Sequence, residues 1–410
     1  MGFRYKGAVL SATAPTTSSS AASAVWASQQ QMQATAASAW PAPPPPPPAS
    51  LYQLWAWGAN GSGQNGLNDI DPNSYGRSSP TQVGTLTDWG TSFKQGNTTS
   101  MAVKADGTLW AWGTNSSGDS GLNDTTNRSS PTQVGALTNW SQIGDGQSTT
   151  GFVVLKTNGT LWSWGGASDG VLGQNDVVSR SSPTQIGSDT NWNGVWQGQG
   201  QVMASKTDGT LWVWGWNFFG NLGLNDTASR SSPTQLGISN WSKISSGQNQ
   251  FLLIKTDGTL WAWGSNNAGR LGLGDASNRS SPTQVGTGTT WSSIVSGQAN
   301  GTAIKTDGTA WVWGSNGFGR LGMNDAVYRS SPVQLGTDTN WRKVVIHGNH
   351  AIAIKTNNTA WTWGRNFNGL LGDPAATANR SSPVQLGSAT NWQDARIGGT
   401  TTMLSLRIAP

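Results

Sequence analysis

Residues 250–264 read QFLLIKTDGTLWAWG, and this stretch contains the pattern that decides the fold. An apolar run meets Asp257-Gly258, and a second run ends in Trp261-Ala262-Trp263. Asp-Gly between two strand-like runs is a strong hairpin signal, because a type I′ turn needs positive backbone φ angles. The two tryptophans stand two residues apart and therefore face the same side of the sheet. The stretch predicts a hairpin whose tryptophans pack between adjacent sheets.

The same pattern recurs along the chain. Trp-X-Trp-Gly begins seven times, at Trp55, Trp110, Trp162, Trp212, Trp261, Trp311 and Trp361. Arg-Ser-Ser-Pro follows in each unit, at Arg77, Arg128, Arg180, Arg230, Arg279, Arg329 and Arg380. A single Trp comes next, at Trp89, Trp140, Trp192, Trp241, Trp291, Trp341 and Trp392. Repeats at this spacing indicate a solenoid or a propeller.

Each unit predicts about four antiparallel strands. The single Trp opens one strand, and the hairpin supplies two more. The residues after Ser-Ser-Pro, Thr-Gln-Val-Gly in several units, predict a short fourth strand with the Pro on an outer edge. Four antiparallel strands make one propeller blade.

The ends of the repeat region complement each other. The first Trp-X-Trp-Gly, within residues 51–57, has no hairpin strand before it, and residues 400–407 form a strand-like run with no hairpin after it. Pairing these two segments completes one shared blade and removes the exposed edges of an open array. The predicted fold is therefore all-β, a closed seven-bladed β-propeller over residues 51–408.

The composition agrees with many strands joined by tight turns. Gly makes up 55 of the 410 residues, and all 19 acidic residues are Asp rather than the helix-favouring Glu. The 25 Trp residues supply apolar surface for a folded core. Cys is absent, which excludes disulfides, thiolate catalysis and cysteine metal sites.

The distribution of Lys and Arg along the chain indicates which partners to expect. The net charge is +5, but 13 of the 24 Lys and Arg residues recur at fixed repeat positions, which spreads them around the ring. We therefore predict no nucleic-acid partner. No segment approaches the ~18 consecutive apolar residues of a membrane helix, so we also predict no membrane insertion.

The repeat resembles the RCC1, or regulator-of-chromosome-condensation, repeat. One unit reads Trp241, Gly247, an apolar strand at 251–254, Asp257-Gly258, Trp261-Ala262-Trp263-Gly264, Asn266, Gly269-Arg270-Leu271-Gly272, Asp275 and Pro282. The resemblance covers residues 51–408 and implies a seven-bladed propeller. The family often carries His after the Gly of each unit, and here only His350 matches. Nothing in the resemblance carries over nucleotide-exchange activity, because a fold does not by itself transfer function.

Two segments precede the propeller. Residues 1–40 are rich in Ala, Ser, Thr and Gln, and residues 41–50 (PAPPPPPPAS) predict a stiff polyproline linker. The stretch from Ser11 to Gln31 resembles the N-terminal tags of tail fibre and appendage proteins of tailed phages. The resemblance implies that residues 1–40 anchor the chain to other virion proteins.

The recurring polar residues have structural explanations. One Asp precedes each Arg-Ser-Ser-Pro, at Asp69, Asp124, Asp176, Asp226, Asp275, Asp325 and Asp373. Asp–Arg pairing or an Asx turn accounts for it, whereas a calcium site needs several converging oxygens. The Lys of each Lys-Thr-Asp-Gly is expected on the surface beside the hairpin. His347 and His350 lack a further metal ligand. We predict no catalytic residue, no cofactor and no enzymatic activity.

Aromatic residues in the loops are the candidates for binding. Trp216, Phe218 and Phe219 replace small polar residues found in the other units and are the candidate binding residues. Four aromatics occupy comparable loop positions, namely Tyr75, Phe318, Tyr328 and Phe367. Trp196 replaces an Ile or Val. The alternative is that each ring only fills its own loop.

The resemblance of the N-terminal segment implies a virion structural protein located on the phage particle. The propeller of such a tail fibre or appendage adhesin displays a rigid surface for host attachment, to a glycan or a protein, or for particle assembly. Homo-oligomers are compatible with this interpretation. The alternative is a bacterial RCC1-like interaction module, such as an enzyme inhibitor.

Overall fold

The computed structural model describes residues 52–71, 76–95, 98–144, 151–237, 240–367, 369–374, 378–398 and 402–408. The described residues all belong to one compact unit within residues 51–410. The predicted anchor (residues 1–40) and linker (residues 41–50) lie outside the described residues and stay predictions. Within the described residues, no helix has the length and apolar character needed to cross a bilayer.

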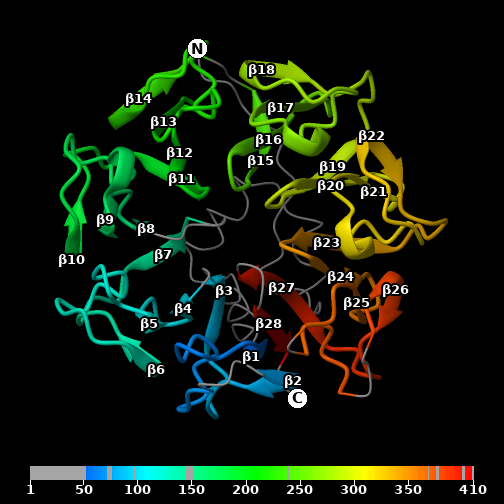
Figure 1. Cartoon of the computed structure of the whole chain (residues 1–410). Helices are drawn as coiled ribbons and strands as arrows, with labels where there is room; N and C mark the ends of the chain where they lie inside the picture. The colour runs from blue at the N-terminus through cyan, green and yellow to red at the C-terminus, as the bar shows by residue number, and fades with distance from the viewer. Residues whose placement is uncertain are drawn as a thin grey trace, which may run out of the picture. The chain divides into compact units, whose positions relative to one another are not determined.

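Seven four-stranded blades surround a central axis, which confirms the predicted fold (Figure 1). Each first strand opens at the single Trp and lies nearest the axis: β3 (Trp89–Gln95), β7 (Trp140–Ile143), β11 (Trp192–Gln197), β15 (Trp241–Ser246), β19 (Trp291–Ser296), β23 (Trp341–His347) and β27 (Trp392–Gly398). The second strands are β4 (Thr99–Lys104), β8 (Phe152–Lys156), β12 (Gln201–Lys206), β16 (Gln250–Lys255), β20 (Asn300–Lys305), β24 (His350–Lys355) and β28 (Thr402–Ile408).

The third strands carry the Trp-X-Trp-Gly motifs: β5 (Leu109–Gly113), β9 (Leu161–Gly165), β13 (Leu211–Gly215), β17 (Leu260–Gly264), β21 (Ala310–Gly314), β25 (Ala360–Gly364) and β1 (Tyr52–Gly58). The outermost, fourth strands are β6 (Arg128–Gln133), β10 (Arg180–Gln185), β14 (Arg230–Leu236), β18 (Arg279–Gln284), β22 (Arg329–Gln334), β26 (Arg380–Gln385) and β2 (Arg77–Gln82). These strands begin at the Arg itself, not after the Pro as predicted, because the Arg pairs with the Gly that ends the third strand. Three of the loops after third strands contain a 3-10 turn: η1 (Ser168–Gly170), η2 (Asn267–Gly269) and η3 (Gly317–Gly319).

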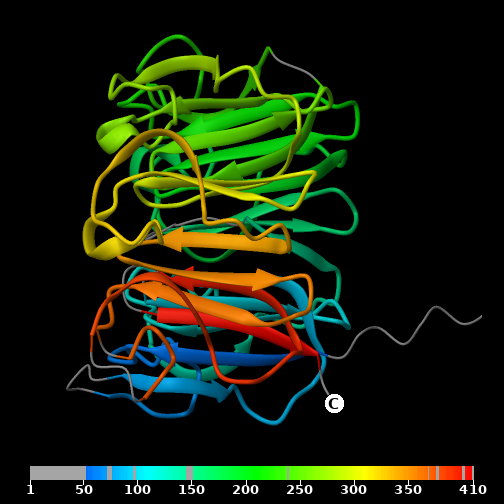
Figure 2. The same ribbon diagram turned by 90° about the vertical axis from the view of Figure 1, so that its right-hand side faces the viewer.

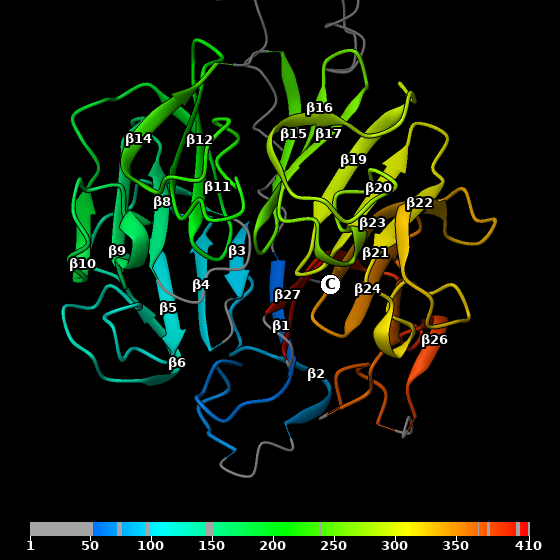
Figure 3. The same cartoon turned by 45° about the horizontal axis from the view of Figure 1, so that its top comes forward.

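Both ends of the repeat region form one blade, as predicted. Strand β28 pairs antiparallel with β1 from Tyr52↔Ile408 to Gly58↔Thr402. Figures 2 and 3 show the blue strand β1 beside the red C-terminal strands. One bridge, Tyr52↔Trp89, also joins this blade to the next. The shared blade closes the ring without a free sheet edge between its ends.

The hairpin turns differ from the prediction. The glycines of the Asp-Gly turns have positive φ, for example Gly258 at 80°, but the aspartates before them are not among the described residues with positive φ. A type I′ turn needs both. Instead, the N–H of Gly258 donates to the carbonyl of Lys255, and Asp257 Oδ1 accepts hydrogen bonds from the backbone and hydroxyl of Thr259. The loop is a type I turn followed by a left-handed residue, stabilised by the Asp side chain.

The second Trp of each motif lies between adjacent blades, as predicted, and five of the first tryptophans pack against a core cluster drawn from two blades: Trp110, Trp162, Trp212, Trp311 and Trp361. The second Trp is fully buried, and its indole Nε1 donates to a backbone carbonyl in the loop of the preceding blade. The seven donor–acceptor pairs are Trp112–Gln64, Trp164–Asp119, Trp214–Val171, Trp263–Asn221, Trp313–Arg270, Trp363–Arg320 and Trp57–Leu370. Every blade is therefore attached to its neighbour by the same buried hydrogen bond.

The prediction that the hairpin lysines lie on the surface is wrong. Lys104, Lys156, Lys206 and Lys355 are all buried. Each of the six hairpin lysines places its ammonium over the first Trp of its motif and over the single Trp, as Lys255 does at 3.8 Å from the Trp261 ring centroid and 5.3 Å from that of Trp241. The sequence suggested a surface position because charged residues beside turns are usually solvated. Here the aromatic faces replace part of that solvation.

Candidate interaction surface

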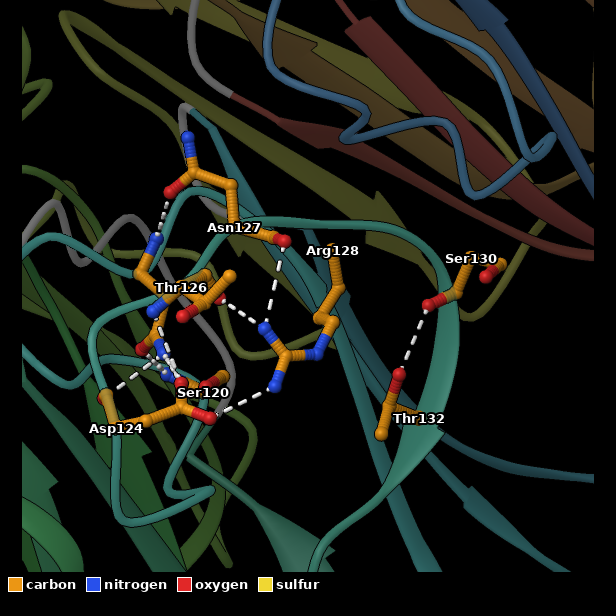
Figure 4. Close-up of polar contacts among 8 residues, drawn as sticks. Ser120, Asp124, Thr126, Asn127, Arg128, Ser130 and Thr132 are labelled. Carbon is orange, nitrogen blue, oxygen red and sulfur yellow. Dashed lines mark hydrogen bonds and ion pairs between the residues drawn. The ribbon is translucent and has the colours of Figure 1, made fainter.

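The loops that join third to fourth strands share a hydrogen-bonded Asp–Arg pair, shown for the loop of Asp124 and Arg128 in Figure 4. Asp124 accepts hydrogen bonds from the Thr126 backbone at 2.9 Å and, through its second oxygen, from Arg128 at 2.7 Å. Arg128 also donates to the Thr126 carbonyl at 2.7 Å. The predicted Asp–Arg pair occurs in all seven loops. The aspartates are therefore structural, and their carboxylates are occupied by the loop itself.

In five of these loops a buried Asn donates a hydrogen bond to the loop Asp: Asn60, Asn115, Asn217, Asn266 and Asn316. Asn266 is fully buried and donates to both the carbonyl and the carboxylate of Asp275, at 3.0 and 2.9 Å. Its side-chain oxygen accepts from the backbone of Leu271. These bonds hold the loop in one conformation, so any side chain on the loop is displayed from a fixed base.

Exposed apolar side chains gather on these loops. Among the described residues, twelve large hydrophobic side chains are exposed, and eight of them lie between third and fourth strands: Ile70, Val177, Val178, Phe218, Phe318, Val327, Tyr328 and Phe367. Successive connections in an antiparallel blade alternate between its two ends, so all of these loops lie on the same face of the ring. We call it the loop face. The 3-10 turns η2 and η3 mark it on the left side of Figure 2.

Trp216, Phe218 and Phe219 form one continuous aromatic group on the blade of β11–β14, which we call the aromatic patch. The rings of Trp216 and Phe218 are parallel, with centroids 6.2 Å apart and planes 6° from each other. Phe219 lies edge-on to both, at 5.3 and 5.1 Å. Phe218 is 66% exposed, so the patch does not simply fill its own loop. Grouped exposed aromatics of this kind can anchor a partner.

A second group spans two adjacent blades and includes a residue that the sequence did not single out. Arg365, after β25, places its guanidinium 5.0 Å from the ring centroid of Phe318 and 4.7 Å from that of Phe367. We call these three residues the Arg365 site. The signal available in the sequence was the departure of Arg365 from Ser265 and Ser315, which occupy the same loop position.

The other aromatic residues that the sequence singled out do not share one environment. Tyr328 is exposed on the loop face, and Tyr75 lies outside the described residues. Trp196 is half-buried and packs against the core between two blades, in contact with a cluster that includes Phe251 and Leu253. Trp196 is therefore a packing residue rather than a loop ligand.

A cavity of mixed polar and apolar lining lies near the axis, between the first strands of five blades. Its lining includes Lys94, Gln95, Ser246, Ser296 and Arg396. The volume that the centre of a water molecule can occupy inside this cavity is about 50 Å³. One water needs roughly 10–15 Å³ on this measure, so this part of the cavity has room for a few waters. Two hollows beside β3 and β7 are larger on the same measure, at about 210 and 360 Å³. The loop face remains the candidate for recognition because the exposed aromatic side chains gather there.

The two histidines are buried neighbours. His347 and His350 oppose each other across the β23–β24 hairpin and are 3% and 0% exposed. Burial, with the nearby Arg320 guanidinium, lowers the pKa of His350 to about 3. Burial, His350 and Arg320 hold the pKa of His347 well below its ordinary value. Both are therefore neutral near pH 7. The described residues contain no group of three or more His, Cys, Asp or Glu side chains placed to hold a metal ion.

The seven blades form a closed β-propeller that presents the loop face on one side of its ring. The chain belongs to the RCC1-like domain family, whose profile matches residues 53–404.

Relatives of known structure share the fold. Prp20p of Saccharomyces cerevisiae superposes with a TM-score of 0.76 at 17% sequence identity, covering 88% of this chain and 92% of that one. Human WBSCR16 gives a TM-score of 0.73 at 20% identity, covering 87% and 98%. At these identities the likeness shows the fold alone.

One curated relative is a much longer protein. Human HERC3, a probable E3 ubiquitin-protein ligase, is 31% identical over 139 residues, which is 33% of this chain and 13% of HERC3. The chain thus matches a small part of that ligase, and the match says nothing of ligase activity here.

Proposed function

We propose that the propeller is a non-catalytic protein-interaction module that binds its partner through the loop face. The observation that carries the proposal is the concentration of exposed apolar side chains on this face, which includes the three contacting rings of the aromatic patch. The loops are held by buried hydrogen bonds, so binding would not require them to become ordered. A related propeller, Prp20p, is described by its binding to Gsp1p and histones, and yeast RCC1 has been solved with Kap60 bound.

The chain offers a matched set of variants to test this proposal. The sibling loop after β17 carries Ser265, Asn267 and Ala268 at the positions of the aromatic patch. The triple variant Trp216→Ser, Phe218→Asn, Phe219→Ala therefore uses residues that this loop design already accommodates. The control variant Leu86→Ser, Leu137→Ser removes two exposed apolar residues at the opposite ends of the blades.

Affinity purification from the source cells, followed by titration calorimetry with the purified partner, is the measurement. We expect the wild type and the control variant to bind the same partner and the patch variant to bind it at least tenfold more weakly. Equal affinity of the patch variant would refute the proposed face.

The resemblance of the N-terminal segment to tags of phage virion proteins supports a more specific function for the same propeller. We propose that residues 1–40 anchor the chain to a phage particle and that residues 41–50 hold the propeller away from it, leaving the loop face for host attachment or assembly. Deleting residues 1–48 should leave the propeller folded and remove the protein from purified particles analysed by proteomics. Unchanged incorporation, or absence of the full chain from particles, would exclude this setting and leave the RCC1-like interaction module or enzyme inhibitor.

A further inference from the structure

The Arg365 site holds a cation between two exposed aromatic rings. Phe318 comes from the loop after β21 and is 46% exposed, and Phe367 comes from the loop after β25 and is 48% exposed. Arg365 contacts both rings from its position directly after β25. A guanidinium that stacks on an aromatic ring through its flat face keeps its N–H donors in its own plane, where they remain available to an acceptor.

Arg365 differs from the other loop arginines in its polar contacts. The seven repeat arginines each pair with an Asp of the same loop. Arg270 and Arg320 donate to backbone carbonyls instead. In the part of the chain that the structure describes, the Arg365 guanidinium forms no ion pair and no hydrogen bond. A held guanidinium with its donors unused is suited to an anionic acceptor from outside the chain.

The backbone of Phe318 gives a second, independent indication. Its φ is +61°, in the left-handed region that is an outlier for a bulky residue. The sibling loops place Asp169 and Ala268 in the same conformation, with φ of 56° and 63°. At the same position Ser62, Ser117 and Phe219 are not among the described residues with positive φ, so the fold requires neither this conformation nor an aromatic ring there. A bulky residue kept in a strained conformation and half exposed indicates a role in binding.

We infer that the Arg365 site binds a carboxylate group of the protein partner, with the Phe318 and Phe367 rings contacting an apolar group next to it. The inference rests on the proposed interaction function and names the chemistry of the partner. A guanidinium matches a carboxylate through two parallel hydrogen bonds, and the rings limit its competing hydration. One guanidinium suits a single carboxylate, whereas a nucleic-acid backbone is bound by several cations along its length.

The experiment uses a small probe that contains both parts of the expected ligand. N-acetyl-phenylalanine carries a carboxylate beside a ring, and N-acetyl-phenylalanine amide is the uncharged control. The full chain is labelled with 15N-arginine, and the Nε–Hε resonance of Arg365 is followed during titration. We expect saturable shifts with the acid, with a dissociation constant on the order of 1 mM, and at least tenfold weaker binding of the amide.

Variants taken from sibling loops keep the fold intact. Arg365→Ser copies Ser265 and Ser315 and should abolish binding, measured by the probe's own line broadening. Arg365→Lys keeps the charge but loses the planar donors, and we expect about tenfold weaker binding. Phe318→Ala copies Ala268 and should weaken binding severalfold. The aromatic-patch variant should bind the acid as the wild type does.

The outcomes separate this inference from the proposed function. Equal binding of acid and amide, absence of binding, or binding that survives Arg365→Ser would overturn the carboxylate site. Tighter binding of inorganic phosphate or a single-stranded oligothymidylate at equal ionic strength would also overturn it, in favour of a phosphate ligand. In another outcome, the acid binds at Arg365 while the aromatic-patch variant still binds the protein partner with wild-type affinity. That result would support the carboxylate site and refute the role of the aromatic patch in binding the partner.

Discussion

The indole Nε1 of Trp57 donates a hydrogen bond to the carbonyl oxygen of Leu370, 3.1 Å away and 313 residues later in the chain. The six other second tryptophans make the same bond to a loop of the preceding blade, at separations of 42–48 residues. The pair Trp57–Leu370 therefore repeats an ordinary blade contact across the ends of the ring. The pairing of β1 with β28 is not the only interaction that closes it.

This equivalence predicts the effect of Trp57→Phe. The substitution keeps a buried ring but removes the donor, leaving the Leu370 carbonyl without its indole partner. We expect the free energy of unfolding to fall by about 1–3 kcal/mol, measured by urea denaturation. Trp363→Phe, which removes the bond from Trp363 to Arg320, is the internal control and should have a similar effect. A negligible effect of Trp57→Phe alone would mean that the end contact does not stabilise the ring.

The lysine–tryptophan contacts predict a loss of stability without loss of packing. Lys255→Met keeps most of the aliphatic side chain over Trp261 and Trp241 but removes the charge. Lys255 forms no ion pair with a described residue, so the variant tests the cation–π contact by itself. We expect the free energy of unfolding to fall by about 1–2 kcal/mol. Lys255→Arg should retain more of the stability, and an unchanged Lys255→Met variant would show that the contact is only steric.

The Asp–Arg loops predict an asymmetry between the two partners. Arg279→Ala removes a half-exposed ion pair, and we expect a decrease of about 0–1 kcal/mol in the free energy of unfolding. Asp275→Ala also removes the acceptor for the buried Asn266 amide and for the Ser277 backbone, and we expect about 1–3 kcal/mol. Equal effects of the two variants in denaturant titration would contradict the structural role given to the Asp.

The buried His350 predicts instability in mild acid. In the unfolded chain a His takes up its proton near pH 6.5, whereas folded His350 does so only near pH 3. Between these values the unfolded state binds more protons, so stability is fully present above pH 6.5 and the free energy of unfolding falls as the pH is lowered. Each such His contributes a slope of up to about 1.4 kcal/mol per pH unit. His347, whose pKa is also lowered, adds to the same slope, and Arg320 is the charged group beside both.

Sibling strands supply the variants for this test. Gln201 and Gln250 pair with the third-strand Gly just as His350 pairs with Gly364, and each donates to a carbonyl of the next blade. His350→Gln should therefore reduce the loss of stability between pH 6.5 and 4.5, measured by thermal unfolding at several pH values. The reciprocal variant Gln250→His should increase it. Parallel pH profiles for wild type and His350→Gln would contradict the assignment.

Much of the fold followed from local patterns. The single Trp marked the start of every first strand, and the Trp-X-Trp spacing placed both rings on one side of the sheet, because strand side chains alternate. The Asp–Arg pairs were predictable because both partners lie within one short loop. The turn type, the start of the fourth strand and the burial of the hairpin lysines were not, since each depends on a partner from another strand or on the packing of whole side chains.

The candidate site was predicted only in part. Trp216, Phe218 and Phe219 stood out because they interrupt a repeat, and the structure shows them in mutual contact. Arg365 interrupts the same repeat, but its contact with Phe318 joins two blades, and no spacing within one unit reveals it.

The sequence by itself determined the number of blades, their strand order and the closure of the ring, because a regular repeat with complementary ends can satisfy its sheet edges in this way. Only the tertiary structure decided which side chains meet between blades: the indole–carbonyl bonds, the lysines over two tryptophans, the neutral histidine pair and Arg365 between two phenylalanines. The physical reason is that hydrogen bonding within a blade follows from local alternation, whereas contacts between blades depend on the angle and spacing of whole sheets around the axis.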